Sequence, residues 1–370
     1  MSARHDTAPH DPVRYRLAQH NTSPRACAAA FTLVELMIAL VIGGLTVIVA
    51  LEMYARGRDL YGVSEHVARL QEQARTAFAV IEPDVEMAGF YGFTQVAQSV
   101  RLIRGGNADA AIAPSQRLRQ FPTRAGDALP AAVGGLPAGA HTCGVNFAVD
   151  VSTPVQGSNN AFVLGRSPAG SCNPYQGRAQ PDADTLTLRR VETQTSDAEA
   201  NRLQIYASLS TSRSAQSLFA DGNAPGPIDE SHRVHNFVVR TYYIARDSVG
   251  QRDFPALRVK SLTRSGTSLI FDEDEVMAGI EDLQVQFGIG SEGTGRATHY
   301  VDPDSPELSA AQVVAVRIWL RVRADRPEPT FVDSRIYRYA NVTYTPAGAD
   351  RSFRRVLMSR TVTLRNARSL

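Results

Sequence analysis

The sequence has few of the residues and motifs from which catalytic and metal sites are built. Its 370 residues include three cysteines and eight histidines, and the histidines are scattered without an HExxH pair. No GxSxG sequence and no phosphate-binding GxxxxGK[ST] loop occurs, so the patterns of serine hydrolases and P-loop NTPases are missing. We therefore predict that the protein is not an enzyme and that it binds no cofactor and no metal ion.

Net charge is also scarce. The formal net charge is +2 at pH 7, which gives no general attraction to nucleic acid or anionic lipid. The C-terminal stretch is locally basic, and its charge could touch the phosphates of DNA. We instead expect a solvated edge strand there, and we do not expect nucleic acid to be a partner. The arginines concerned are Arg351, Arg354, Arg355, Arg360, Arg365 and Arg368.

One long hydrophobic run is present, over residues 31–51, and its only charged residue is Glu35. As a helix this run would be about 32 Å long, which is enough to cross a bilayer. Arginines precede it, so the short N-terminal side should stay in the cytoplasm and the remainder should be exported. A cleaved secretory signal has its small residues after the run, whereas the alanines at 28–30 precede this one.

Glu35 calls for a counter-charge, because a carboxylate in mid-membrane costs about 2.5 to 3.5 kcal/mol on insertion scales. No cation lies within the run. A cut between Ala30 and Phe31 would create one, since the new α-amino group of Phe31 would lie one turn from Glu35 or beside the Glu35 of a neighbouring subunit. The alternative is an ordinary signal anchor whose glutamate reaches toward the membrane surface.

The sequence FTLVELMIAL, residues 31–40, resembles the processing and methylation segment of type IV prepilins and type II secretion pseudopilins. The resemblance implies that a prepilin peptidase cuts between Ala30 and Phe31 and methylates the amine of Phe31. It also implies that Glu35 pairs with a neighbouring subunit's amine and sets the register of assembly. Two features depart from that family: the residue before the cut is usually glycine, and a leader of residues 1–30 is long.

The helix is predicted to continue beyond the membrane-spanning part, over residues 31–88 in all. Apolar residues recur at alternating spacings of three and four, which indicates one buried face. We expect this face to pack on the protein's own globular domain, with a free coiled coil as the alternative. Pro83 should kink or end the helix, and Gly89 should stop it. The stripe comprises Leu60, Val63, Val67, Leu70, Ala74, Ala77 and Ile81.

Residues 89–184 read as a loop-rich variable region, and residues 185–370 as a β-rich domain. Cys143 and Cys172 lie in the first of these and are expected to form a disulfide if the region is exported to an oxidising compartment. In the second, alternating apolar and polar residues predict strands of a largely antiparallel sheet. The predicted strands are residues 185–191, 203–209, 237–245, 256–262, 283–289 and 314–322.

The clearest strand is 314–322, whose apolar side chains should share one face while Arg317, Trp319 and Arg321 occupy the solvated face. Two other motifs resemble ligand-binding sequences, but we do not expect them to bind ligands. The acidic runs at 272–275 and 302–307 are expected to be solvated turns, with calcium binding as the alternative. GIGSEG, residues 288–293, matches the GxGxxG spacing, but turn-like sequence follows it, so we expect a flexible hairpin.

Further segments narrow the resemblance. VEMAGFYGF at 85–93 resembles the larger minor pilins, and IEDLQVQFGIG, VVAVRIWLRVRA and RRVLMSRTVTLRN resemble the C-terminal half of minor pilins of the PilW type. The resemblance implies an α+β, type IV pilin-like fold, with a long N-terminal helix that spans the membrane in its first half and packs on a largely antiparallel β-sheet domain. It also implies a minor pilin that helps to prime type IV pilus assembly within a tip complex.

The same resemblance implies where the protein lies and what it contacts. We expect a single pass through the inner membrane, with the C-terminal domain in the periplasm and, after assembly, at the pilus tip. Expected partners are the prepilin peptidase, other minor pilins, the major pilin and the inner-membrane assembly platform. The alternatives are a J-type minor pseudopilin of type II secretion and a pilus-tip adhesin or DNA-binding module.

Overall fold

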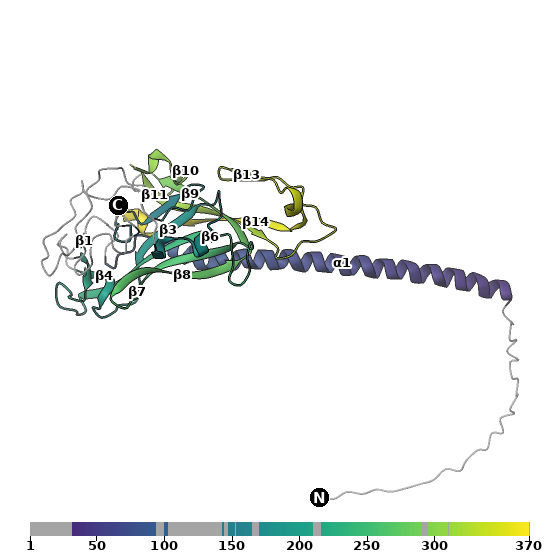
Figure 1. The fold of residues 1–370 in the computed structure, drawn as a ribbon, viewed down its shortest axis with the longest axis horizontal. Helices are drawn as coiled ribbons and strands as arrows, with labels where there is room; N and C mark the ends of the chain where they lie inside the picture. The colour runs from purple at the N-terminus through teal and green to yellow at the C-terminus, as the bar shows by residue number, and fades with distance from the viewer. Residues whose placement is uncertain are drawn as a thin grey trace, which may run out of the picture. The chain divides into compact units, whose positions relative to one another are not determined.

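The computed structural model describes residues 32–93, 100–102, 143, 147–151, 153–164, 170–209, 216–290, 295–309 and 311–369. The chain divides into two compact units, Met1–Tyr61 and Gly62–Leu370. One helix, α1 (Leu33–Glu86), begins in the first unit and ends in the second (Figure 1). Its bounds lie within two residues of the range expected from the sequence, 31–88.

The end of α1 is set by a proline and a glycine. Pro83 lies in the last turn, where it removes one backbone donor, and the helix ends three residues later at Glu86. The amide of Met87 still donates to the Pro83 carbonyl at 3.1 Å. Gly89 then adopts φ +78°, which glycine tolerates without strain, and its amide donates to the Arg189 carbonyl at 3.0 Å. The chain thus leaves the helix directly into contact with the sheet.

Among the described residues, the larger sheet of the second unit has eight strands, in the order β1-β5-β4-β6-β3-β2, with β7 paired to β6 and β8 paired to β7. All pairs are antiparallel except β1 with β5. The strands are β1 (Val100–Leu102), β2 (Val155–Ser158), β3 (Thr185–Val191), β4 (Ala200–Ser208), β5 (Gln216–Asp221), β6 (His232–Ala245), β7 (Ala256–Ser265) and β8 (Ser268–Ala278).

A four-stranded antiparallel sheet follows, in the order β10-β9-β11-β14. Its strands are β9 (Ile280–Gly290), β10 (Ala297–Val301), β11 (Gln312–Arg323) and β14 (Arg355–Thr363), and a small hairpin of β12 (Tyr337–Tyr339) and β13 (Val342–Tyr344) lies between β11 and β14 in the chain. These bounds confirm the predicted fold class of a long helix with a largely antiparallel β domain. The segment 288–293 falls at the β9–β10 hairpin, as expected, although residues 291–294 lie outside the described residues.

The main core lies between the second half of α1 and strands of both sheets. The helix contributes the second part of the predicted stripe, which is Leu70, Ala74, Ala77 and Ile81, with Phe78 beside it. Val67 is half-buried, and the side chains of Leu60 and Val63 lie outside the described residues. Burying a side chain such as that of Phe78 or Ile81 stabilises the fold by about 1.5 to 3 kcal/mol each. The sheets contribute the inward residues of β3, β6, β7, β9 and β11. The helix therefore packs on its own domain rather than in a free coiled coil.

In strand β11, the alternation of apolar and polar residues correctly predicts the buried face but not the exposure of the opposite face. Val314, Val316, Ile318, Leu320 and Val322 are all buried in the main core, which confirms the inward face. The opposite face is not wholly solvated, because Arg321 is only 5% exposed. Aromatic rings of the β12–β13 hairpin cover it, and the hairpin lies at least 14 residues further along the chain.

The acidic run at 272–275 is a strand and not a solvated turn, which corrects the expectation from the sequence. It lies within β8, opposite residues 258–261 of β7. That register places Glu273 3.5 Å from Lys260 and Glu275 3.1 Å from Arg258. The acids are therefore one half of a set of cross-strand ion pairs, which a search for turns along the sequence does not reveal.

Candidate functional site

The first candidate site is the start of α1. Thr32 immediately precedes the helix, and its side-chain oxygen accepts a hydrogen bond from the Glu35 amide at 3.2 Å. In return, Oε2 of Glu35 accepts the Thr32 amide at 3.0 Å and the Thr32 hydroxyl at 3.1 Å. This reciprocal arrangement is a capping box, which satisfies donors that the first turn of a helix otherwise leaves open. Ala30 and Phe31, the expected cleavage site, lie outside the described residues.

The capping box gives Glu35 a fixed position without a counter-charge. Both of its side-chain contacts are made by Oε2, and Oε1 accepts no hydrogen bond from the part of the chain that the structure describes. Glu35 is also the only charged residue between Thr32 and Leu51. The site can therefore accept a cationic donor from outside, and it presents the carboxylate in the first helical turn.

The helix that follows has the length and composition of a membrane span. Leu33–Gly57 form a 25-residue segment whose most apolar window has a mean hydropathy of 2.6, and none of that window is buried within the protein. As a helix it is about 37 Å long. Large side chains such as Leu40, Leu45 and Leu51 are each more than half exposed, which is unfavourable in water and favourable in lipid.

Within the second unit, α1 is held at its C-terminal end by a buried carboxylate. Asp84 is 2% exposed and accepts hydrogen bonds from Arg190 at 2.8 Å, Arg240 at 3.0 Å and the Tyr242 hydroxyl at 2.6 Å. Burial first, and then the Asp84 charge, raise the pKa of Tyr242, so its hydroxyl stays protonated and donates. Two strands, β3 and β6, thus bind one residue of the helix.

Most of the C-terminal arginines form ion pairs with other residues of the chain. Arg360 lies 3.5 Å from Glu82 of α1, and Arg365 forms an ion pair with Glu86. Arg354 pairs with Glu328 and Arg355 with Glu281, each at 2.7 Å. Arg351 has no ion-pair partner among the described residues, and the side chain of Arg368 lies outside them. These pairs account for most of the basic C-terminus without nucleic acid.

A buried charge cluster that the sequence did not reveal joins β9, β11 and β14. Arg321 donates to Glu281 at 2.6 Å and lies 3.3 Å from Asp282, and Arg355, which is fully buried, donates to the same Glu281. The Tyr339 hydroxyl donates to Asp282. Burial raises the pKa of Asp282, and the Arg321 charge opposes that rise. The only signal in the sequence was arginine recurring on the polar face of β11.

The expected cysteine pair is brought together. Cys143 and Cys172 are joined by a disulfide, with their Cα atoms 5.6 Å apart. Both cysteines are buried in a second core cluster with Phe147 and Tyr91, whose hydroxyl donates to the Val151 carbonyl at 2.7 Å. The bond therefore joins two points of the loop-rich region, and the cluster packs this region against Tyr91, just after α1.

Comparisons with known proteins agree with these features. The Prokaryotic N-terminal methylation motif matches residues 25–51, which include the capping box and most of the apolar span. The family described as Type IV Pilus-assembly protein W matches residues 241–366, from the end of β6 through the four-stranded sheet and the β12–β13 hairpin. Together the two family models match a type IV minor pilin.

The pilin family that the chain matches consists of non-enzymatic structural proteins. The methylation motif together with the apolar helix indicates anchoring in a membrane. No curated protein matches the chain. Among solved structures, a type IV-like pilin from Thermus thermophilus matches at 14% identity and a TM-score of 0.24, over 53% of this chain and 81% of that one. At that score the likeness carries no argument, and the fold class rests on the helix and sheets themselves.

Proposed function

We propose that this PilW-family protein is a minor pilin that helps to prime type IV pilus assembly, in a tip complex with other minor pilins. The observation that carries the proposal is Glu35, a single carboxylate held by Thr32 at the start of a 25-residue apolar helix. A prepilin peptidase cuts between Ala30 and Phe31 and methylates the new amine. That amine, on a neighbouring subunit, is the counter-charge for Glu35.

The carboxylate acts as a register mark for assembly. In the first turn of the helix it keeps its hydrogen bonds to Thr32, and its remaining oxygen accepts the neighbour's ammonium. Because the surroundings are apolar, the pair is favourable only when the two helices are aligned at this position. Other lateral positions leave the acid and the amine unpaired. A small cluster of such helices also removes the entropy cost of bringing the first subunits of a filament together.

The globular domain lies in the periplasm, with the N-terminus of the chain in the cytoplasm. The disulfide between Cys143 and Cys172 supports a periplasmic location of the domain, since such bonds persist in oxidising compartments. The partners are the peptidase, the other minor pilins, the major pilin and the inner-membrane assembly platform. Energy for assembly comes from a separate cytoplasmic ATPase, because this sequence has no phosphate-binding loop.

The register role is tested by Glu35→Gln in the full chain, with Glu52→Gln as the matched control. Glu52 lies on the same helix, is exposed and pairs with Arg56 one turn away. A charge-assisted hydrogen bond contributes about 1.5 to 3 kcal/mol, so we expect Glu35→Gln to lower incorporation into sheared pili by about tenfold or more. Glu52→Gln should change it little. Equal incorporation of the two variants, measured by immunoblot, would refute the register role.

Processing and pathway need separate measurements. Mass spectrometry of the mature protein should find an N-methylated Phe31, and an intact leader would contradict the proposal. Deletion of the gene should abolish twitching and leave exoprotein secretion unchanged. The opposite result identifies a J-type minor pseudopilin of type II secretion. The pilus-tip DNA-binding alternative is weakened by the ion pairs of Arg354, Arg355, Arg360 and Arg365.

A further inference from the structure

One end of the second unit is defined by where α1 enters it. His66 lies 3.0 Å from Glu328, and Arg69 lies 3.9 Å from Asp325, in the segment that follows β11. The loop 246–253 after β6 belongs to the same end, because it and residues 344–350 line one cleft of about 320 Å³. We call residues 246–253 and 324–354 the entry-end loops.

The entry-end loops expose aliphatic side chains that a free soluble surface would not need. Val249 is 65% exposed, Val332 58% and Ile336 51%. These three come from two separate stretches of chain, and each is more than half exposed. Large aliphatic groups of this kind are what peripheral proteins insert into the headgroup region of a bilayer.

The same loops expose positive charge, while their acids are neutralised within the protein. Arg252, Arg326 and Arg351 are exposed, and among the described residues only Arg252 has an ion-pair partner, Asp253 at 4.0 Å. The acids of these loops are each paired, in the sets Asp247–Arg178, Asp253–Arg178, Asp325–Arg69, Glu328–Arg354, Asp333–Arg335 and Asp350–Arg323.

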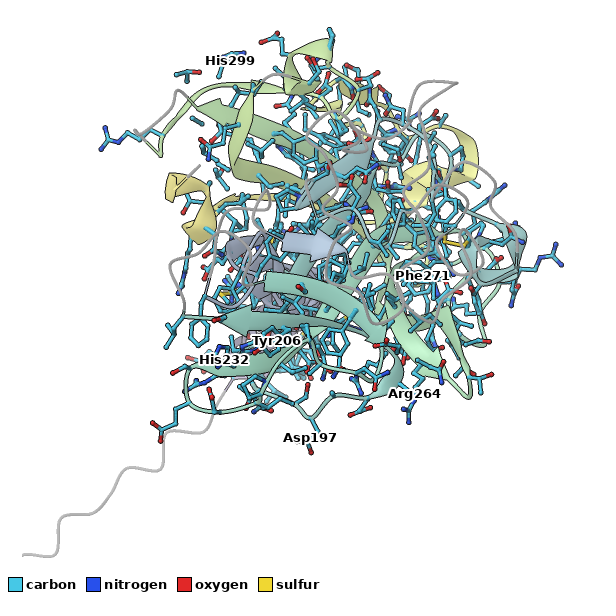
Figure 2. All side chains as sticks on the ribbon, turned by 90° about the vertical axis from the view of Figure 1, so that its left-hand side faces the viewer. Asp197, Tyr206, His232, Arg264, Phe271 and His299 are labelled. Carbon is cyan, nitrogen blue, oxygen red and sulfur yellow. A yellow bond between two sulfur atoms is a disulfide. The ribbon has the colours of Figure 1, made fainter. Side chains whose placement is uncertain are left out.

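The opposite end of β6 is mainly acidic. There Asp197, Asp229 and Glu230 line a cleft of about 620 Å³ together with Ile228, His232 and Arg233, and Asp229 pairs with His232. Figure 2 looks onto the unit from that side and labels Asp197, Tyr206 and His232, and the rings of Tyr206 and His232 are stacked. β6 has 14 residues, so the two ends are separated by roughly 45 Å of strand. An anionic surface would attract the entry end and repel this one.

We propose that the entry-end loops rest on the anionic surface of the membrane that α1 spans. Val249, Val332 and Ile336 enter the headgroup region, and Arg252, Arg326 and Arg351 contact lipid phosphates. The inference rests on the proposed function, which places α1 in that membrane. Chain length supports it: Gly57, the last residue of the span, and His66 are nine residues apart, which is at most about 32 Å in any conformation.

The contact would hold a subunit upright before assembly and would be released when the subunit leaves the bilayer. This makes it a property of the membrane pool and not of the finished filament. The surface that binds lipid is then free to meet the next subunit. The contact of the entry-end loops with anionic lipid and the insertion of α1 into the bilayer therefore depend on different residues, so the two can be tested separately.

The test uses the full chain in nanodiscs, with tryptophan as the reporter. Trp319 is the only tryptophan, so Trp319→Phe gives a silent background. Three single probes are added to it: Val332→Trp at the entry end, Ile228→Trp at the opposite end, and Leu45→Trp within the span. Ile228 is the matched control, because it is an aliphatic residue of similar exposure, 50%. Quenching is measured with brominated phosphatidylglycerol and with brominated phosphatidylcholine.

We expect brominated phosphatidylglycerol to quench the fluorescence of Val332→Trp at least about twofold more than that of Ile228→Trp. With brominated phosphatidylcholine, the difference between the two probes should be smaller. Equal quenching of the two probes would overturn the inference. If Leu45→Trp is still quenched, the membrane span and the proposed function survive that result, whereas an unquenched Leu45→Trp contradicts the span itself. A change that is equally large with unbrominated lipid marks contact with another protein copy and also overturns the inference.

Discussion

Replacing Asp84 with alanine tests how the helix is fastened to its domain. The carboxylate is 2% exposed and binds Arg190, Arg240 and Tyr242 at 2.6 to 3.0 Å. Its removal leaves two guanidinium groups and a hydroxyl without their shared acceptor in a site that water reaches poorly. Removing one partner of a buried charge pair costs about 3 to 5 kcal/mol. We expect a loss of that size in the free energy of unfolding.

The assay is urea denaturation of the full chain in detergent, followed by the fluorescence of Trp319 on β11. Glu72→Ala is the control on the same helix, because Glu72 is 70% exposed and lies 3.8 Å from Arg75. Exposed pairs of this kind contribute about 0 to 1 kcal/mol. If Asp84→Ala destabilises the protein by less than about 1 kcal/mol at an unchanged denaturant slope, the buried ion pairs do not fasten the helix and the reasoning fails.

Two further predictions concern the disulfide and a buried acid. Replacing Cys143 and Cys172 together with serine opens a loop with a sequence separation of 29 and should lower the free energy of unfolding by about 3.5 kcal/mol, measured by the same urea titration. A loss no larger than that of a surface substitution would contradict it. Burial raises the pKa of Asp184 from 3.8 to about 7, so the folded state binds an extra proton between those values and loses stability as pH rises through about 7. Asp184→Asn should remove that loss, of up to roughly 4 kcal/mol between pH 4 and 8, and an unchanged pH profile would refute the assignment.

The segment proposed to act in assembly could be predicted from the sequence because its signals are local. Thr32 and Glu35 are three residues apart, and the apolar span is a continuous run, so both are legible without a fold. The helix bounds, the extent of β3 and the buried face of β11 follow from periods of 3.6 and 2 within a few residues. The capping of Glu35 by Thr32 was not predicted, although the spacing of the two residues is that of a capping box.

The failures have a common physical origin in strand register. The acidic run at 272–275 is a strand because β7 places Arg258 and Lys260 opposite it. Arg321 is buried because Glu281, 40 residues earlier, and the β12–β13 hairpin enclose it. Counting charge along the chain cannot distinguish such residues from solvated ones, since a guanidinium is buried only where partners from other strands meet it.

The amino-acid sequence alone determined the apolar segment that is long enough to span a membrane, the methylation motif with Glu35, and the periodicities that predict a helix and an antiparallel sheet, because each depends on residues that are neighbours in the chain. Only the tertiary structure decided which charges are internal. Asp84 contacts residues more than 100 positions away in the sequence. Arg360 and Arg365, near the end of the chain, contact Glu82 and Glu86 of α1. Those pairings depend on how two sheets pack around one helix, which no local pattern specifies.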